Sequence, residues 1–86
     1  MTIQPIGVAC SATTARASML RIADVWSELG QINQALDFYL RIIARYPGSP
    51  EAHEAEERSL AQAQAYERQG QFRLALSLYE KLEPHS

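Results

Sequence analysis

Residues 30–42 read GQINQALDFYLRI, and residues 70–82 read GQFRLALSLYEKL. The two segments share Gly-Gln, Ala-Leu and Tyr at identical spacing, and they begin 40 residues apart. A sequence that repeats itself at a period of roughly 20–50 residues is typical of proteins built from stacked structural units. We therefore expect the chain to be organised around two copies of one unit.

The composition favours one small, all-α domain. The chain has 86 residues, and 47% of them are apolar, which is too many for a disordered protein. Ala, Leu, Gln, Glu and Arg dominate the apolar-periodic segments, and these residues favour helices. The eight Lys and Arg residues are spread along the chain and the net charge is −2, so we expect no nucleic-acid partner. No apolar segment approaches the roughly 20 residues of a membrane span.

The two ends of the chain differ from this periodic part. Residues 1–10 contain proline and glycine without a helical period, so we expect a flexible leader there and a short tail at residues 84–86. The segment before Cys10 is loosely similar to a lipoprotein cleavage site, but no Lys or Arg precedes this cysteine. A secretory signal needs a basic start, so we expect a cytoplasmic protein. One cysteine excludes an intramolecular disulfide.

The first predicted hairpin covers about residues 11–46. Its helices span about 11–29 and 32–46, with Gly30 placed to end the first helix in a left-handed conformation and Pro47 stopping the second. Apolar side chains three and four residues apart predict the buried sides of both helices. They are Met19, Ile22, Ala23, Trp26 and Leu29 in the first helix, and Ile32, Ala35, Leu36, Tyr39, Ile42 and Ile43 in the second.

The second predicted hairpin covers about residues 50–83. Ser49 is a capping residue followed by proline, which predicts a helix over about 50–69, and Gly70 separates it from a helix over 72–82. The predicted buried side of the third helix consists mostly of small residues. The two sides are Ala52, Ala55, Leu60, Ala61, Ala63, Ala65 and Tyr66 in the third helix, and Phe72, Ala75, Leu76, Tyr79 and Leu82 in the fourth.

Some apolar side chains lie outside these predicted sides. The second hairpin can cover Phe38 and Leu40, whereas Leu74 and Leu78 form a pair one turn apart with no third hairpin after them. Because uncovered apolar surface favours association, we predict that Leu74 and Leu78 bind protein. Trp26 belongs to a predicted buried side, so we interpret it as a core residue rather than a binding hot spot.

The pattern resembles the tetratricopeptide repeat, W-x2-L-G-x2-Y followed by A-x3-F and P. The first copy has Met, Ala and Trp in place of the consensus Trp, Gly and Tyr, and the second departs at Ser59 and Gln62. The period is longer than the family's roughly 34 residues, because the third helix is extended. The matching positions are Met19, Ile22, Ala23, Trp26, Gly30, Ala35, Tyr39 and Pro47 in the first copy, and Ala63, Tyr66, Gly70, Ala75 and Tyr79 in the second.

The resemblance implies two antiparallel helix hairpins stacked with a right-handed offset, that is, a four-helix fragment of an α-solenoid. It also implies protein binding through the first helix of each hairpin, without catalysis and without a cofactor. Some members hold a peptide carboxylate with Lys and Asn on these helices, and the corresponding residues here are Leu20, Asp24, Leu60 and Gln64. Because the basic and amide groups of that clamp are missing, we expect these four residues to contact a different kind of protein partner.

We find no constellation of residues that predicts catalysis or metal binding. A nucleophilic pair would need Cys10 with His53 or His85, and nothing in the sequence fixes their geometry. His53 with Glu56 or Glu57 offers too few ligands for a metal, and acidic residues near a helix start are explained by the helix dipole.

We therefore predict a small non-catalytic module that binds protein as a scaffold or accessory subunit of a larger assembly. The assembly could be associated with a membrane. The alternative is a homodimeric adaptor that completes its solenoid by self-association, because about three stacked repeats are usually needed for stability. A small-ligand carrier or an enzyme is less favoured, since the sequence shows no set of converging polar groups.

Overall fold

The computed structural model describes residues 11–83, which form four α-helices. They are α2 (Ser11–Glu28), α3 (Ile32–Arg45), α4 (Pro50–Arg68) and α5 (Phe72–Leu82). These bounds agree within about one residue with the helices predicted from the sequence, and the all-α fold class is confirmed. The predicted leader at residues 1–10 and the tail at residues 84–86 lie outside the described residues.

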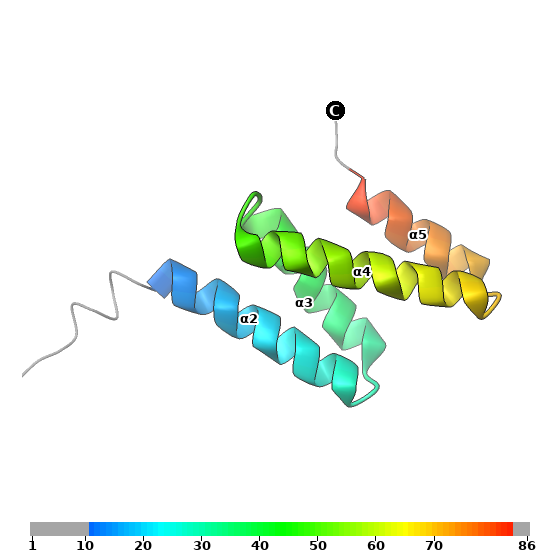
Figure 1. The fold of residues 1–86 in the computed structure, drawn as a ribbon, viewed down its shortest axis with the longest axis horizontal. Helices are drawn as coiled ribbons and strands as arrows, with labels where there is room; N and C mark the ends of the chain where they lie inside the picture. The colour runs from blue at the N-terminus through cyan, green and yellow to red at the C-terminus, as the bar shows by residue number, and fades with distance from the viewer. Residues whose placement is uncertain (1–10, 84–86) are drawn as a thin grey trace, which may run out of the picture.

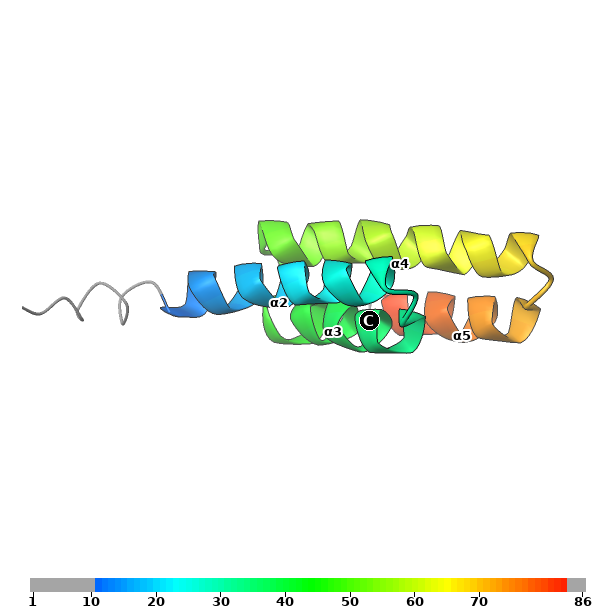
Figure 2. The same cartoon turned by 90° about the horizontal axis from the view of Figure 1, so that it is seen from below.

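The helices form two antiparallel hairpins, α2–α3 and α4–α5, that stack side by side (Figure 1). Viewed from below, α2 and α4 lie in one layer and α3 and α5 in the other (Figure 2). Helix α4 packs on α5 of its own hairpin and on α3 of the hairpin before it. Helices α2 and α5 are therefore the outermost helices, on opposite sides of the stack (Figure 1).

Gly30 and Gly70 turn the two hairpins in the same way. Their φ angles are 84° and 81°, in the left-handed region that glycine occupies without strain. Each glycine N–H donates to the carbonyl three residues earlier at 3.0 Å, and the next N–H donates to the carbonyl five residues earlier at 2.9 and 2.8 Å. This is the Schellman motif. Because it recurs 40 residues later, α3 and α5 start in the same register.

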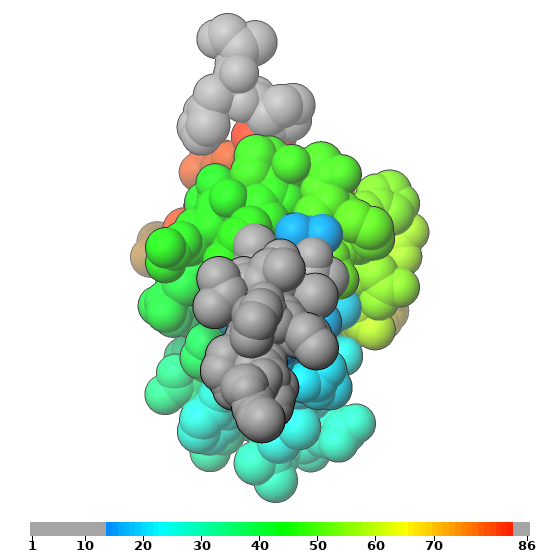
Figure 3. Space-filling model, turned by 90° about the vertical axis from the view of Figure 1, so that its left-hand side faces the viewer, coloured from blue at the N-terminus to red at the C-terminus, as the bar shows by residue number. Residues whose placement is uncertain are grey.

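Ser49 joins the hairpins by capping α4, as the sequence predicts. Its hydroxyl accepts a hydrogen bond from the Ala52 N–H at 3.1 Å and donates to the Tyr46 carbonyl at 2.7 Å. Pro50 occupies the first turn, where its missing N–H costs nothing. Figure 3 looks at this end of the molecule, where α3 passes into α4. Local hydrogen bonds thus stabilise this turn.

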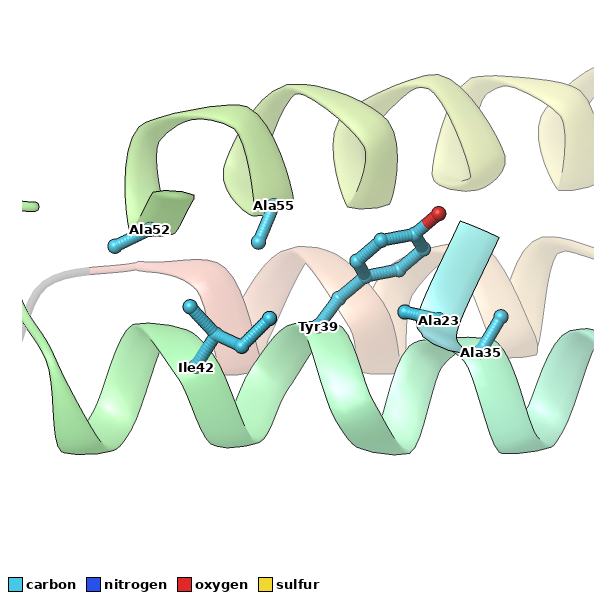
Figure 4. Packing of buried hydrophobic residues seen from close by; sticks show 6 residues of the cluster. All are labelled: Ala23, Ala35, Tyr39, Ile42, Ala52 and Ala55. Carbon is cyan, nitrogen blue, oxygen red and sulfur yellow. The ribbon is translucent and has the colours of Figure 1, made fainter. Parts of the chain in front are cut away.

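The first core lies between α2, α3 and the start of α4. Ile42 is fully buried and points towards Ala52 and Ala55 of α4 (Figure 4). These alanines let α4 approach α3 closely, as the small residues of the third predicted helix indicate. The cluster consists of Ala23, Ala35, Tyr39, Ile42, Ala52 and Ala55, and Met19, Leu20, Trp26, Leu36, Phe38, Ile43 and Tyr46 pack against it.

The second core joins the two hairpins. It consists of Ala63, Tyr66, Ala75 and Leu78, and Ile32, Leu36, Leu40, Tyr79 and Leu82 pack against it. Helix α3 therefore contributes to both cores, and its Leu36 touches both clusters. The prediction that the second hairpin covers Phe38 and Leu40 is confirmed for Leu40, while Phe38 packs against the first core.

The predicted orientation of α5 is wrong. Leu78, expected to lack cover, is only 4% exposed, whereas Phe72 and Leu76, expected to be buried, are 68% and 60% exposed. The reason is that α5 turns Ala75 and Leu78 towards α4 and α3. Leu74, the other member of the predicted uncovered pair, is half-exposed.

Two further side chains on α2 depart from the prediction. Ile22 and Leu29 were expected in the core, and both are exposed together with Val25. Helix α2 packs mainly on α3, so only a narrow side that carries Ala23 is fully buried. On α4, Leu60 and Ala61 are likewise exposed instead of buried.

Candidate protein-binding surfaces

The four residues predicted on the first helices do not form one surface. Leu20 packs partly buried against the first core, and Gln64 is exposed on α4. Asp24 lines a hollow between α2, α3 and α4, whereas Leu60 lines another hollow between α3, α4 and α5. The structure therefore separates the residues that the repeat pattern places at equivalent positions.

Asp24 is engaged in a network that ties three helices together. The Tyr39 hydroxyl of α3 donates to Asp24 Oδ1 of α2 at 2.5 Å, and Arg58 Nε of α4 lies 3.1 Å from the same oxygen. Arg58 also contacts Glu54 one turn earlier, with Nη1 to Oε1 at 2.6 Å. Burial, and next the hydrogen bond to Asp24, raise the pKa of Tyr39 above its usual range. Asp24 thus holds the hairpins together.

A second ion pair joins the same two hairpins nearer the start of α2. Arg16 Nε lies 2.7 Å from Glu51 Oε1 in the first turn of α4. The hydrogen bond from Arg16 lowers the pKa of Glu51, and the dipole of α4 favours a carboxylate at this place. The junction between the hairpins therefore combines apolar packing with two charged contacts.

Beside Asp24 the structure has an open hollow of about 460 Å³. Its floor is α3 and its walls are α2 and α4. It is lined by Asp24, Ser27, Glu28, Ile32, Ala35, Leu36, Tyr39, Arg58, Ala61 and Gln62. Asp24 and Arg58 are paired with each other here, whereas Glu28, Ser27 and Gln62 add further polar groups to the lining.

A groove runs between α3 and α5 on the other side of α4, and its lining combines leucines with polar side chains that include Asp37, Glu56 and Lys81. One part, of about 210 Å³, is lined by Leu36, Leu40, Leu74 and Leu78 among others, and the larger part, of about 670 Å³, is lined by Leu40, Ile43, Leu60 and Leu82 among others. Leu40 and Lys81 line both parts, so we treat them as one feature, the α3–α5 groove. The predicted pair Leu74 and Leu78 lines its smaller part, and Leu60, predicted separately on the third helix, lines its larger part.

Two further apolar surfaces lie on the outermost helices. The α5 face consists of Phe72 and Leu76, one turn apart, and the α2 face consists of Ile22, Val25 and Leu29, spaced three and four residues apart; all five side chains are exposed. The sequence pattern predicts four of them, Ile22, Leu29, Phe72 and Leu76, to be core residues. The signal that could have found them is the repeat itself, since Phe72 and Leu76 are the counterparts of Ile32 and Leu36.

The described residues contain no group of three or more His, Cys, Asp and Glu side chains able to hold a metal. His53 Nε2 lies 3.4 Å from Glu57 Oε2 on the exposed side of α4. Cys10 and His85, considered above for a nucleophilic pair, lie outside residues 11–83. None of the described helices has both the length and the apolar character needed to cross a membrane.

Comparison with known families agrees with the geometry of the first hairpin. Residues 17–49, from the first turns of α2 to the cap of α4, match the family model described as Tetratricopeptide repeat. The comparisons with curated proteins and with solved structures give no significant match. The second hairpin lies beyond this match, and its likeness to the first rests on the recurring turn and helix pattern.

Proposed function

We propose that this chain, whose residues 17–49 match the Tetratricopeptide repeat family model, is a non-catalytic protein-binding module that serves as a scaffold or accessory subunit of a larger assembly. Proteins of stacked helical repeats present extended surfaces to their partners. What remains to be assigned is the surface that the partner uses.

The observation that carries the proposal is the α3–α5 groove. Its exposed leucines are Leu60 on α4, in the larger part, and Leu74 on α5, in the smaller part, and Leu40 lines both parts. An amphipathic helix that lays leucine-sized side chains into such a groove is a common mode of recognition. Lys81 lines both parts of the groove and can pair with an acidic residue of the partner.

The experiment identifies the partner and then removes its contact. Tagged chain is cross-linked in the source cells, the captured protein is identified, and its direct binding to purified chain is measured by calorimetry. We expect Leu60→Glu with Leu74→Glu to weaken this binding at least tenfold, because two charges would be buried in the groove. The control, Ala61→Glu with Gln71→Glu, adds the same charge at exposed positions that do not line the groove and should bind as wild type does.

The proposal fails if the double leucine variant binds its partner with unchanged affinity while it keeps wild-type helicity. It also fails if no captured protein binds the purified chain directly. Gln64 follows Leu60 by one turn and is exposed, so we propose it as a polar contact at the rim of the groove. Gln64→Ala should therefore reduce affinity less than either leucine substitution.

A further inference from the structure

We infer that this chain stacks head to tail on copies of itself, with the α5 face of one copy covering the α2 face of the next. The inference rests on the proposed protein-binding role and names one partner, a second copy of the chain. It concerns the outermost helices, so it can fail while binding in the α3–α5 groove stands. The chain already makes one contact of the same kind, where its second hairpin packs against α3 of its first hairpin.

Within the chain, one side of α3 is covered by the second hairpin. Ile32, Leu36 and Leu40 pack against the core formed by Ala63, Tyr66, Ala75 and Leu78. These three α3 residues are spaced four apart and form a single stripe. The stripe is the first half of the junction between hairpins.

Helix α5 carries the counterpart of the apolar stripe on α3. Phe72 and Leu76 follow Ile32 and Leu36 by 40 residues, and the identical turns at Gly30 and Gly70 set both helices in the same register. On α5, however, these side chains are 68% and 60% exposed. The α5 face is therefore a junction surface whose counterpart lies outside the described residues of this copy.

The second half of the junction recurs on the opposite side of the molecule. Tyr66 and Leu78 belong to the core against which α3 packs, and Gln62 lines the hollow beside α3; their counterparts 40 residues earlier are Trp26, Phe38 and Ile22. All three counterparts are apolar, and none of them is fully buried. Val25 of α2 and Leu29, the residue directly after α2, are exposed beside Ile22 and extend this surface. The α2 face is thus at least as apolar as the surface it would imitate.

Charged contacts are not repeated at this second junction. Asp24 and Arg58 join the hairpins, whereas their repeat counterparts are Gln64 and Ser18. In the stripe itself, Glu80 occupies the place of Leu40. The contact between copies therefore rests on Phe72 and Leu76 against the α2 face, and it should be weaker than the internal junction and depend on concentration.

A head-to-tail contact differs in a testable way from a symmetric dimer. It joins two different surfaces, so each added copy leaves one α5 face and one α2 face open for the next. A symmetric contact would pair two α5 faces and leave both α2 faces uncovered. The two arrangements are separated by blocking one face at a time.

The experiment measures mass by light scattering for three proteins, alone and mixed. Wild type should grow in mass with concentration, while Phe72→Glu with Leu76→Glu, and Ile22→Glu with Val25→Glu, should each remain monomeric. An equimolar mixture of the two variants should give twice the monomer mass and nothing larger, because it contains one intact pair of faces. Circular dichroism checks that each variant is helical. If a Glu variant is not helical, the same two positions are substituted with Ser instead.

Three results would overturn the inference. The α2-face variant could dimerise alone, which would show a symmetric contact between α5 faces. The mixture could stay monomeric while wild type associates, which would place self-association elsewhere. Wild type could also remain monomeric at every concentration. If the leucine variants of the groove still lose their partner in that case, the proposed protein-binding function holds and only the stacking is wrong.

Discussion

Helices α3 and α5 hold the same place in their hairpins, yet α3 is covered on two sides and α5 on one. Ile32 and Leu36 of α3 pack against the second core, while their counterparts Phe72 and Leu76 remain exposed. On this side the first two positions are apolar in both helices, and only the third differs, with Glu80 in place of Leu40. The difference teaches that burial in a stacked-repeat protein is decided by the neighbouring unit as much as by the helix's own pattern.

Matched truncations in the two helices should show this contrast most strongly. Ile42 is fully buried between α3 and α4, whereas its counterpart Leu82 is only partly buried at the end of α5. We expect Ile42→Ala to lower the free energy of unfolding by about 3 kcal/mol, through lost transfer energy and a cavity. Leu82→Ala should cost about 1 kcal/mol, because less of its area is buried. Urea unfolding of both variants measures the difference, and equal losses would contradict the comparison.

The tyrosines at equivalent positions provide the next contrast. Tyr39 donates to Asp24, which also holds Arg58, so Tyr39→Phe should lower the free energy of unfolding by about 1.5 kcal/mol, as for a hydrogen bond to a charged group. Burial, and next a hydrogen bond to Glu67, raise the pKa of Tyr79, but Tyr79 lies on the less covered helix, so Tyr79→Phe should lower the free energy of unfolding less than Tyr39→Phe does. Urea unfolding measures both variants. An equal loss of stability in the Tyr79 variant would show that the Tyr39–Asp24–Arg58 network adds no stability beyond that of a tyrosine on the less covered helix.

The network also has a pH dependence. The pKa of Tyr39 is raised in the folded state, so its contribution to stability is complete below the usual value of 10.0 and is lost as pH rises through the folded value. Wild type and the Tyr39→Phe variant should therefore approach the same stability in strongly alkaline solution. A stability difference that stays constant up to and beyond this range would contradict the assignment.

Ser59 is a position where truncation should raise, not lower, the free energy of unfolding, and its counterpart in the first hairpin is Met19. Ser59 is fully buried in α4, and its hydroxyl has no hydrogen-bond partner within the described residues. Burying an unpaired hydroxyl is unfavourable, so Ser59→Ala should raise the free energy of unfolding by about 1 kcal/mol. A lower stability would mean that the hydroxyl is satisfied in solution. Met19, which carries no such group, packs in the first core.

The smallest expected effect concerns the ion pair at the start of α4. The pKa of Glu51 is lowered by Arg16, so this contact adds stability above the usual value of 4.5 and loses it as pH falls through the lower, folded value. Arg16→Gln should be slightly less stable than wild type at neutral pH and equal to it in acid. Thermal unfolding across this range tests the prediction, and a gap that persists at low pH would contradict it.

Much of the fold could be predicted because its signals are local. Helix ends depend on Gly30, Gly70 and the Ser49 cap, each of which acts within a few residues. The core positions Ala35 and Tyr39 follow from three- and four-residue spacing and from the family pattern. These features need no knowledge of how the hairpins pack.

The binding surfaces could not be predicted in the same way. Helix α5 is apolar around more than one side, so spacing alone could not decide between a buried Leu76 and a buried Leu78. That choice is made by contacts with α3, more than thirty residues earlier in the chain. The Asp24–Arg58 pair is likewise a long-range contact between hairpins, and no local pattern indicates it.

The central claim is that the exposed faces of α5 and α2 are two halves of the junction that the chain makes between its own hairpins. The most direct test is the mass, by light scattering, of an equimolar mixture of the variant blocked on the α5 face and the variant blocked on the α2 face. The account predicts monomers from each variant alone and a dimer from the mixture. A mixture that stays monomeric, or a dimer from either variant alone, would contradict it.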